Sequence, residues 1–332
     1  MPERSEHIVL SRTDSIGDVM LSLPMAGLLK KRFPRSYITF LGRSYTTPVL
    51  ERCSHIDNII TLEQLTVNGE RGAVELLRRS HIDAFVHVFP VRRIARWAAL
   101  AEIPHKIGTN RRWWHWLHCD HRIALSRRNS DLHEAQLNTR LLAPFGIAAD
   151  LTTHELAAYS GFFPSAADQQ LKDLIRPRRR NIILHPHSSG SAVEWGLEKY
   201  AELIRLLHPG DFHVIITGTE LEAERYRSKL PINLPHVTDL GGKLDLPRLI
   251  SLIGICDALV AASTGPLHIA AACGIRAIGL YANVRPIHPG RWAPIGRSAH
   301  AVIEEDIPPD SDPQQHINAI KPEKVMRLLE SS

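Results

Sequence analysis

The chain has 332 residues, which is longer than one ordinary core and suits two domains of about 150 residues each. Apolar residues make up 44% and charged residues 23%, as in globular proteins, and no run approaches the roughly 20 apolar residues of a membrane span. The net charge of +5 favours an anionic partner such as a phosphorylated substrate, a membrane face or a nucleic acid.

The first residues and the cysteines indicate the cellular compartment of the protein. Residues 1–7 are polar and lead into a short apolar run, without the basic start or the apolar segment of a secretory signal. The cysteines are widely spaced and form no C-x-x-C pair: Cys53, Cys119, Cys256 and Cys273. We therefore expect a cytoplasmic protein without disulfides.

The first half of the chain alternates strand and helix patterns. An apolar run at residues 7–11 is followed by a polar loop and by a helical pattern at residues 19–32, which ends before Pro34. Further apolar runs at residues 37–41 and 84–89 read as buried strands. Such alternation predicts a parallel sheet with helices on both faces.

The pattern restarts after residues 176–180, a basic, proline-marked stretch that we interpret as a linker. The predicted strands are residues 182–185, 213–217, 258–262 and 277–281, and the predicted helices are residues 197–207, 221–229, 245–254, 266–273 and 322–329. Residues 308–315 are predicted to be a loop. The chain is thus predicted to be an α/β protein with two doubly wound, Rossmann-like domains, residues 1–175 and 176–332, whose ligand loops face an interdomain crevice.

The predicted strand at residues 258–262 ends in Ser263 and Thr264, and a helix begins at Gly265 and Pro266. Unpaired N–H groups at a helix start, together with the helix dipole, favour an anion such as a diphosphate. The two hydroxyls add further donors. The alternative is that Ser263 or Thr264 only caps the helix.

A second strand end, at Arg12, leads through Asp14, Ser15 and Gly17 to Asp18. Gly17 permits a backbone turn that other residues disfavour, and Asp18 is expected at the start of the next helix, facing the cleft. A carboxylate there can take a proton from an acceptor hydroxyl, or it can simply cap the helix. Arg12 either binds a phosphate or pairs with Asp14.

Two basic and aromatic segments are further candidates. Residues 285–294 form a proline-rich loop in which Arg291 suits an anion, unless the loop is a solvated one anchored by Trp292. Residues 111–116 place arginines beside three tryptophans, which suits an anionic membrane surface or a lipid-linked acceptor, or else a packed patch with a basic edge. The histidines of residues 115–121 match no standard metal spacing, so we expect no metal site.

Several motifs stand in a fixed order along the chain: R-T-D-S-I-G-D-V at residues 12–19, H-P-H-S at 185–188, W-G-L-E-K-Y at 195–200, T-G-T-E at 217–220 and S-T-G-P-L-H at 263–268. Their order and placement resemble the lipopolysaccharide heptosyltransferases of glycosyltransferase family 9. The resemblance spans nearly the whole chain, is weak between about residues 63 and 180, and is strongest in the second predicted domain.

The resemblance implies a GT-B fold, an ADP-heptose donor, an inner-core lipopolysaccharide acceptor and inversion at the anomeric carbon, with no metal or other cofactor. It implies that Asp18 is the catalytic base and that Glu220 or Glu222 contacts the ribose. It implies that Thr264, Gly265, Leu267 and His268 hold the nucleotide diphosphate. Together with the local patterns, the candidate donor-binding residues are Ser188, Ser189, Thr217, Gly218, Glu220, Glu222, Ser263, Thr264, Gly265, Pro266, Leu267 and His268, and the candidate acceptor or phosphate contacts are Arg12, Ser15, Gly17 and Arg291.

The expected partners are a nucleotide-sugar donor, a lipid-linked or phosphorylated glycan acceptor, and the cytoplasmic face of the inner membrane as a peripheral contact. A nucleic acid is not expected, because the basic residues are scattered and no reader motif is present. Neither strand-to-helix turn reads G-x-G-x-x-G, which argues against a dinucleotide-dependent oxidoreductase.

The chain departs from the family pattern at Ser263, where an aspartate is common, and at Val193, where a lysine or arginine is common. These departures leave a different nucleotide sugar, or a catalytically impaired nucleotide-sugar-binding protein, as alternatives. An epimerase or hydrolase with the same diphosphate site is another.

Overall fold

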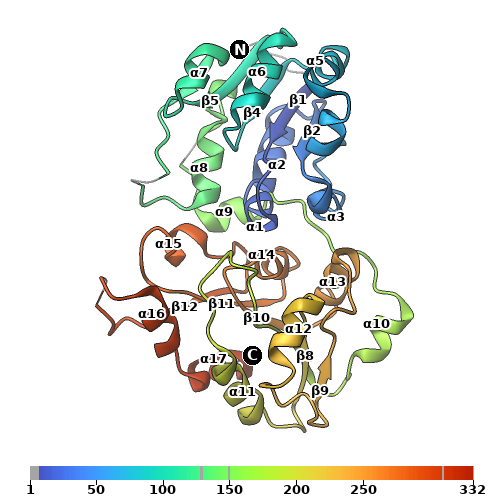
Figure 1. The fold of residues 1–332 in the computed structure, drawn as a ribbon, viewed down its shortest axis with the longest axis vertical. Helices are drawn as coiled ribbons and strands as arrows, with labels where there is room; N and C mark the ends of the chain where they lie inside the picture. Colours follow the sequence, from blue (N-terminus) through green and yellow to red (C-terminus); the bar gives the residue numbers. More distant parts are fainter. Residues whose placement is uncertain (1–6, 128–129, 149, 309, 332) are drawn as a thin grey trace. The chain divides into compact units, whose positions relative to one another are not determined.

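The computed structural model describes residues 7–127, 130–148, 150–308 and 310–331 (Figure 1). The chain divides into two compact units, Met1–Phe163 and Pro164–Ser332. This division lies upstream of the predicted boundary at residue 176, so the basic stretch predicted as a linker belongs to the second unit. The reason is local: the Arg176 backbone N–H donates to Asn181 Oδ1 at 2.8 Å, and Asp168 pairs with Arg248 at 3.3 Å.

The first unit contains a six-stranded parallel sheet with the strand order β3-β2-β1-β4-β5-β6. Its strands are β1 (His7–Ser11), β2 (Tyr37–Gly42), β3 (Asn58–Thr61), β4 (Ala84–His87), β5 (His105–Thr109) and β6 (His121–Ile123). Its helices are α1 (Ile16–Met20), α2 (Leu23–Arg32), α3 (Thr47–Leu50), α4 (Leu62–Thr66), α5 (Gly69–Arg79), α6 (Arg92–Leu100), α7 (Trp113–His118), α8 (Glu134–Arg140) and α9 (Thr153–Ala157), with 3-10 turns at Ser44–Thr46 and Ala143–Phe145.

The second unit contains another six-stranded parallel sheet, in the order β12-β11-β10-β7-β8-β9. Its strands are β7 (Arg180–His185), β8 (Phe212–Ile216), β9 (Val237–Asp239), β10 (Ala258–Ala262), β11 (Arg276–Leu280) and β12 (Ala299–Val302). Its helices are α10 (Gln169–Leu174), α11 (Leu197–Leu206), α12 (Glu220–Tyr226), α13 (Leu246–Ile253), α14 (Gly265–Ala272), α15 (Pro289–Trp292), α16 (Pro313–Ala319) and α17 (Pro322–Glu330).

Both sheets reverse their strand order at one point, between β1 and β4 in the first unit and between β7 and β10 in the second. Doubly wound sheets bind ligands at such a switch point, outside the carboxyl ends of the strands. The register pairs Ser11 with His87, and Ala261 with His185, so the segments that follow these residues leave their sheets side by side. Each predicted ligand loop is therefore at the switch point of its own sheet.

Trp195 is the anchor of the second core. Its ring is fully buried and lies edge-on to Tyr200, with ring centroids 5.0 Å apart. Its Nε1 donates to the Ile320 carbonyl oxygen at 3.0 Å, which satisfies the polar atom that a buried indole carries. The W-G-L-E-K-Y motif thus attaches the start of α11 to the C-terminal helices.

The structure corrects several predicted elements. The helix predicted at residues 19–32 is two helices, because Pro24 lacks an N–H and lies in the first turn of α2. The loop predicted at residues 308–315 gives way to α16, whose start Asp312 caps by accepting the Gln314 N–H at 2.7 Å. Short edge strands such as β6 and β9 were not predicted, because three residues are too few to show the alternation of apolar and polar residues that identifies a strand.

Across the described parts of the chain, none of the helices combines the length and apolar character needed to span a bilayer.

Candidate functional site

In the first unit, Ser15 forms the cap of α1. Its Oγ accepts the Asp18 N–H at 3.4 Å and donates to Asp18 Oδ2 at 2.5 Å. Asp18 therefore lies in the first turn of the helix and is not its cap. Gly17 also lies within the helix and not in the positive-φ turn expected of it, because the cap at Ser15 starts the helix before it. Asp18 keeps a partly exposed carboxylate, its side chain 17% exposed.

Arg12 connects this turn to the interior. Its side chain is 2% exposed and binds both Asp14, at 2.9 and 3.1 Å, and Asp18. Its Nη1 also donates to Glu134 Oε1 at 3.0 Å and to Asn138 Oδ1 at 2.9 Å. These protein groups accept hydrogen bonds from the N–H donors of the guanidinium, and Arg12 thus lies beside Asp18. The predicted phosphate contact of Arg12 stays a prediction.

Burial and charge compete within this cluster. Burial alone would lower the pKa of Arg12, but Asp14, Asp18 and Glu134 raise it above its ordinary value. Burial raises the pKa of Asp14 to about 6 against the opposing effect of Arg12. Two carboxylates thus share one cation at the mouth of α1, a combination that is common in functional sites.

Sequence analysis missed the residues that hold Arg12 in place. Glu134 is fully buried and also binds Arg127 Nε at 2.8 Å, while Asn138 binds Arg127 Nη2 at 3.0 Å. The Asn138 amide donates to the Leu21 carbonyl oxygen at 3.2 Å. The available signal was the spacing of Glu134 and Asn138, four residues apart on one face of a helix.

In the second unit, Thr264 occupies the cap position of α14 but does not cap it. Its side chain makes no capping hydrogen bond, and within the described structure Oγ1 is buried without a partner. Pro266 removes one of the N–H groups of the first turn, and Gly265 and Leu267 retain theirs. The capping alternative from the sequence is therefore wrong for Thr264, and its contact with a diphosphate stays a prediction.

The Ser263 side chain lies near Tyr281. The Tyr281 hydroxyl donates to the Trp292 carbonyl oxygen at 2.8 Å. Trp292 Nε1 donates to the Pro286 carbonyl oxygen at 2.9 Å, and the Arg291 guanidinium lies 4.7 Å from the Trp292 ring centroid. The tryptophan thus anchors its loop, as one alternative expected, and the predicted anion contact of Arg291 stays a prediction.

The loop after β7 is ordered by Glu194, a residue that sequence analysis did not select. Its Oε1 accepts the Ser188 N–H at 2.7 Å and the Ser188 hydroxyl at 3.1 Å, and its Oε2 contacts His187 Nδ1 at 2.9 Å. Ser189 Oγ donates to Glu222 Oε1 at 2.7 Å. Ser188 and Ser189 thus lie at the switch point, beside the start of α14, with hydroxyls engaged by carboxylates.

The two candidate ribose contacts have different surroundings. Glu222 completes a capping box with Thr219, whose N–H donates to Oε2 at 2.8 Å. Burial would raise the pKa of Glu222, but the hydrogen bonds from Thr219 and Ser189 lower it. Glu220 is exposed and bound to Arg227 at 2.6 Å. The fixed role of Glu222 leaves Glu220 the more accessible of the two.

Two further predicted donor-binding residues, Thr217 and Gly218, follow directly after β8. Thr217 Oγ1 is 3.0 Å from Nδ1 of His185, and burial lowers the pKa of this histidine to about 4. Leu267 and His268 are buried in α14, so their side chains contribute to the floor of the site while the first turn presents its backbone.

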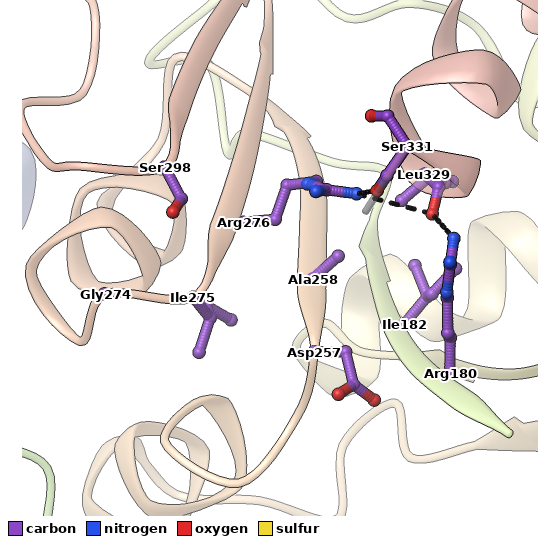
Figure 2. A pocket seen from close by; sticks show the side chains of 10 residues that line it. All are labelled: Arg180, Ile182, Asp257, Ala258, Gly274, Ile275, Arg276, Ser298, Leu329 and Ser331. Atoms are coloured by element: carbon purple, nitrogen blue, oxygen red, sulfur yellow. Dashed lines mark hydrogen bonds between the residues drawn. The ribbon is translucent and has the colours of Figure 1, made fainter. Parts of the chain in front are cut away.

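A separate cavity of about 300 Å³ lies at the opposite edge of the second sheet (Figure 2). Arg180 and Arg276 begin β7 and β11, and their guanidinium groups point to carbonyl oxygens at the end of α17, including that of Leu328 at 2.8 Å. Because it lies at the amino ends of the strands and its cations are occupied, this cavity is not the predicted donor site. Among the described residues, no group of three or more His, Cys, Asp or Glu side chains is arranged to hold a metal ion.

Comparison with known proteins agrees with this geometry. Residues 93–319 match the model of the family described as glycosyltransferase family 9 (heptosyltransferase). A Haemophilus influenzae protein provisionally named a glycosyltransferase is 29% identical over 304 residues, 87% of this chain and 86% of that protein. The lipopolysaccharide core heptosyltransferase OpsX of the same organism is 25% identical over 86% of this chain and 81% of its own length.

Solved structures agree in fold. The Escherichia coli ADP-heptose lipopolysaccharide heptosyltransferase II superposes with a TM-score of 0.77 at 21% identity, covering 98% of this chain and 97% of that one. The E. coli heptosyltransferase WaaC with ADP gives a TM-score of 0.72 at 16% identity, over 98% and 99% of the two chains. The predicted fold class, two doubly wound units of the GT-B type, is confirmed.

Proposed function

Since the chain belongs to glycosyltransferase family 9, we propose that it is an inverting transferase that moves heptose from ADP-heptose onto a lipopolysaccharide core or related glycan acceptor. The observation that carries the donor half of this proposal is the unpartnered, buried Thr264 hydroxyl at the start of α14. A hydroxyl without a protein partner, beside free backbone N–H groups, suits a diphosphate oxygen.

In this proposal the diphosphate lies against the first turn of α14. As the bond between the anomeric carbon and the diphosphate oxygen breaks, negative charge grows on the leaving group. The Gly265 and Leu267 N–H groups and the Thr264 hydroxyl are fixed before the reaction, so they stabilise this charge more in the transition state than in the ground state. The displacement requires no bound metal.

The acceptor half of the proposal rests on Asp18. The acceptor oxygen attacks the anomeric carbon from the side opposite the leaving group, and its proton passes to the Asp18 carboxylate. Ser15 and Arg12 each bind one oxygen of this carboxylate, which orients the group. Direct displacement with a single base gives inversion.

One observation favours a second candidate, a different sugar on the same nucleotide site. Ser263 stands where the family often has an aspartate. A donor carboxylate is thus replaced by a neutral hydroxyl. The acceptor, in either case, is proposed to be a lipid-linked glycan at the cytoplasmic face of the inner membrane.

The Asp18→Asn variant tests the assignment of the base. We expect transfer to fall by about three orders of magnitude, since general-base catalysis contributes ~10²–10⁴-fold. ADP binding should stay unchanged, because Asp18 lies in the first unit and α14 in the second. Transfer is measured by ADP release with acceptor, and binding by calorimetry; a fully active variant contradicts the assignment.

The identity of the donor is tested with the wild-type protein. A thermal-shift panel of ADP, GDP and UDP with their sugars should show the largest stabilisation with ADP-heptose, since a ligand that binds only the folded state raises the unfolding midpoint. Stabilisation by UDP alone would overturn the heptose proposal and leave the fold unaffected. ADP release without acceptor would instead indicate a hydrolase.

A further inference from the structure

Helix α7 exposes an unusual set of apolar side chains. Trp113 is 56% exposed, Trp116 59% and Leu117 70%. Their spacing of three and four residues places them on one side of the helix. On the other side, His115 is fully buried and its Nδ1 is 3.0 Å from the Thr109 carbonyl oxygen, while Cys119 is buried just beyond the helix. The buried side of α7 is thus packed against the rest of the first unit.

Two contacts hold the exposed rings in place. Trp116 Nε1 donates to the Asn110 carbonyl oxygen at 3.0 Å, so its polar edge faces the protein while much of the ring stays exposed. Helix α6 packs against α7, and the two lie next to each other in Figure 1. The guanidinium of Arg92, at the start of α6, lies 4.6 Å from the centroid of the Trp113 ring. The apolar side chains therefore form a persistent surface.

Several arginines lie close to this surface. Arg122 lies 4.8 Å from the Trp116 ring centroid and Arg112 lies 5.5 Å from that of Trp114. Among the described residues, none of the following exposed arginines forms an ion pair with a carboxylate: Arg92, Arg93, Arg111, Arg112 and Arg122.

The nearby acids are already engaged. Glu70 binds Arg96 at 3.1 Å, and Asp120 binds Lys106 at 2.8 Å. The patch made by these five arginines with Trp113, Trp116 and Leu117, called here the α7 patch, is therefore strongly positive. An anionic partner that also accepts apolar side chains is the complementary surface.

We propose that the α7 patch docks the protein on an anionic phospholipid bilayer. Tryptophan rings favour the headgroup level of a membrane, the Leu117 side chain enters the acyl boundary, and arginines pair with lipid phosphates while their stems cover apolar surface. Exposed tryptophans and a leucine beside these arginines match the interface of a bilayer, where apolar side chains and lipid phosphates are both bound, which favours a bilayer over an acidic protein. This inference does not depend on the donor of the proposed function.

Vesicle sedimentation of the full chain tests the inference. Wild-type protein should sediment with vesicles of phosphatidylglycerol and phosphatidylethanolamine but hardly with phosphatidylcholine alone, and added salt should weaken the binding. The variant Trp116→Ser/Leu117→Ser should bind phosphatidylglycerol vesicles about tenfold more weakly, as should Arg111→Glu/Arg112→Glu. Thermal unfolding of each variant confirms that it is folded.

Matched controls lie in the second unit. Leu221 is as exposed as Leu117, and Arg178 is likewise an exposed arginine, so Leu221→Ser and Arg178→Glu should bind vesicles as the wild type does. Equal binding by the α7 variants and the controls would overturn the proposal, as would wild-type protein that binds polyglutamate but not vesicles. The assay contains neither donor nor acceptor, so its outcome is separate from that of the transfer assays.

Discussion

Arg12 is the residue on which the first candidate site depends. A buried arginine is tolerated because carboxylates surround it. Removing one of these carboxylates leaves the cluster with positive charge that is not compensated. Glu134 balances Arg12 from the protein interior, opposite the exposed Asp18. We infer that Glu134 is a positioning residue, which limits how strongly Arg12 draws on the Asp18 carboxylate.

The Glu134→Gln variant keeps the size of the side chain and removes its charge. Arg12 should then bind the Asp18 carboxylate more strongly and compete with the acceptor hydroxyl for it, so kcat should fall by about tenfold while KM for the donor stays constant. Steady-state kinetics measure both parameters.

Glu51→Gln is the control, because Glu51 is exposed and forms no ion pair with Arg12 among the described residues. It should leave kcat unchanged. A Glu134→Gln variant that loses stability but keeps the wild-type kcat would reduce Glu134 to a purely structural role.

At the scale of the element, α14 is a helix whose N-cap residue, Thr264, makes no capping hydrogen bond with its side chain. A threonine at this position ordinarily accepts an N–H from the second or third helical residue. Here Pro266 is in the first turn, and the Thr264 hydroxyl makes no capping bond. In α12 the equivalent residue behaves in the ordinary way, since Thr219 Oγ1 accepts the Glu222 N–H at 3.3 Å.

The pair of substitutions Thr264→Val and Thr219→Val separates binding from capping. Thr264→Val should weaken ADP binding by about tenfold, the loss of one hydrogen bond to a charged group, without loss of stability. Thr219→Val should lower the free energy of unfolding by about 1 kcal/mol. Calorimetry and chemical denaturation provide the two readouts. Equal destabilisation by both variants would show that Thr264 is a cap.

At the scale of the whole molecule, buried histidines in both units are kept neutral. Burial lowers the pKa of His87 well below its usual 6.5, and lowers those of His115, His185 and His213 to about 4. His87 contacts Phe85 and His115 through its ring faces, and within the described structure neither of its ring nitrogens has a hydrogen-bond partner.

These histidines make stability depend on pH. The unfolded chain takes up protons as the pH falls through about 6.5, whereas these histidines stay neutral in the folded protein well below that pH, so each of them favours unfolding as the pH falls. His87→Phe should therefore flatten the fall in unfolding free energy between about pH 7 and pH 5, by up to about 1.4 kcal/mol per pH unit. Denaturation at several pH values measures the slope.

The exposed His208 supplies the control, and His208→Phe should keep the wild-type slope. The His87→Phe variant should also be at least as stable as wild type near pH 7, because a phenyl ring has no nitrogens to leave unpaired. An unchanged slope in His87→Phe would mean that His87 takes up its proton as readily in the folded protein as in the unfolded chain.

Local pattern was enough for the central strands and for the first turn of each site. The strand β10 was predicted with its observed bounds, because five consecutive buried residues followed by Ser263 and Thr264 give a clear signal. Asp18 and Thr264 were selected for a related reason, since each lies at the start of the helix that follows a central strand. Their roles as base and diphosphate contact stay predictions.

The sequence by itself determined two doubly wound units, the turns at their switch points and the family, because these depend on short-range periodicity and on motifs of consecutive residues. Tertiary structure alone decided that Glu134 holds Arg12 across 122 residues, that Glu194 orders the loop after β7, and that the Thr264 hydroxyl is unpartnered. Burial and pairing between distant residues arise only when the chain folds, and no local pattern encodes them.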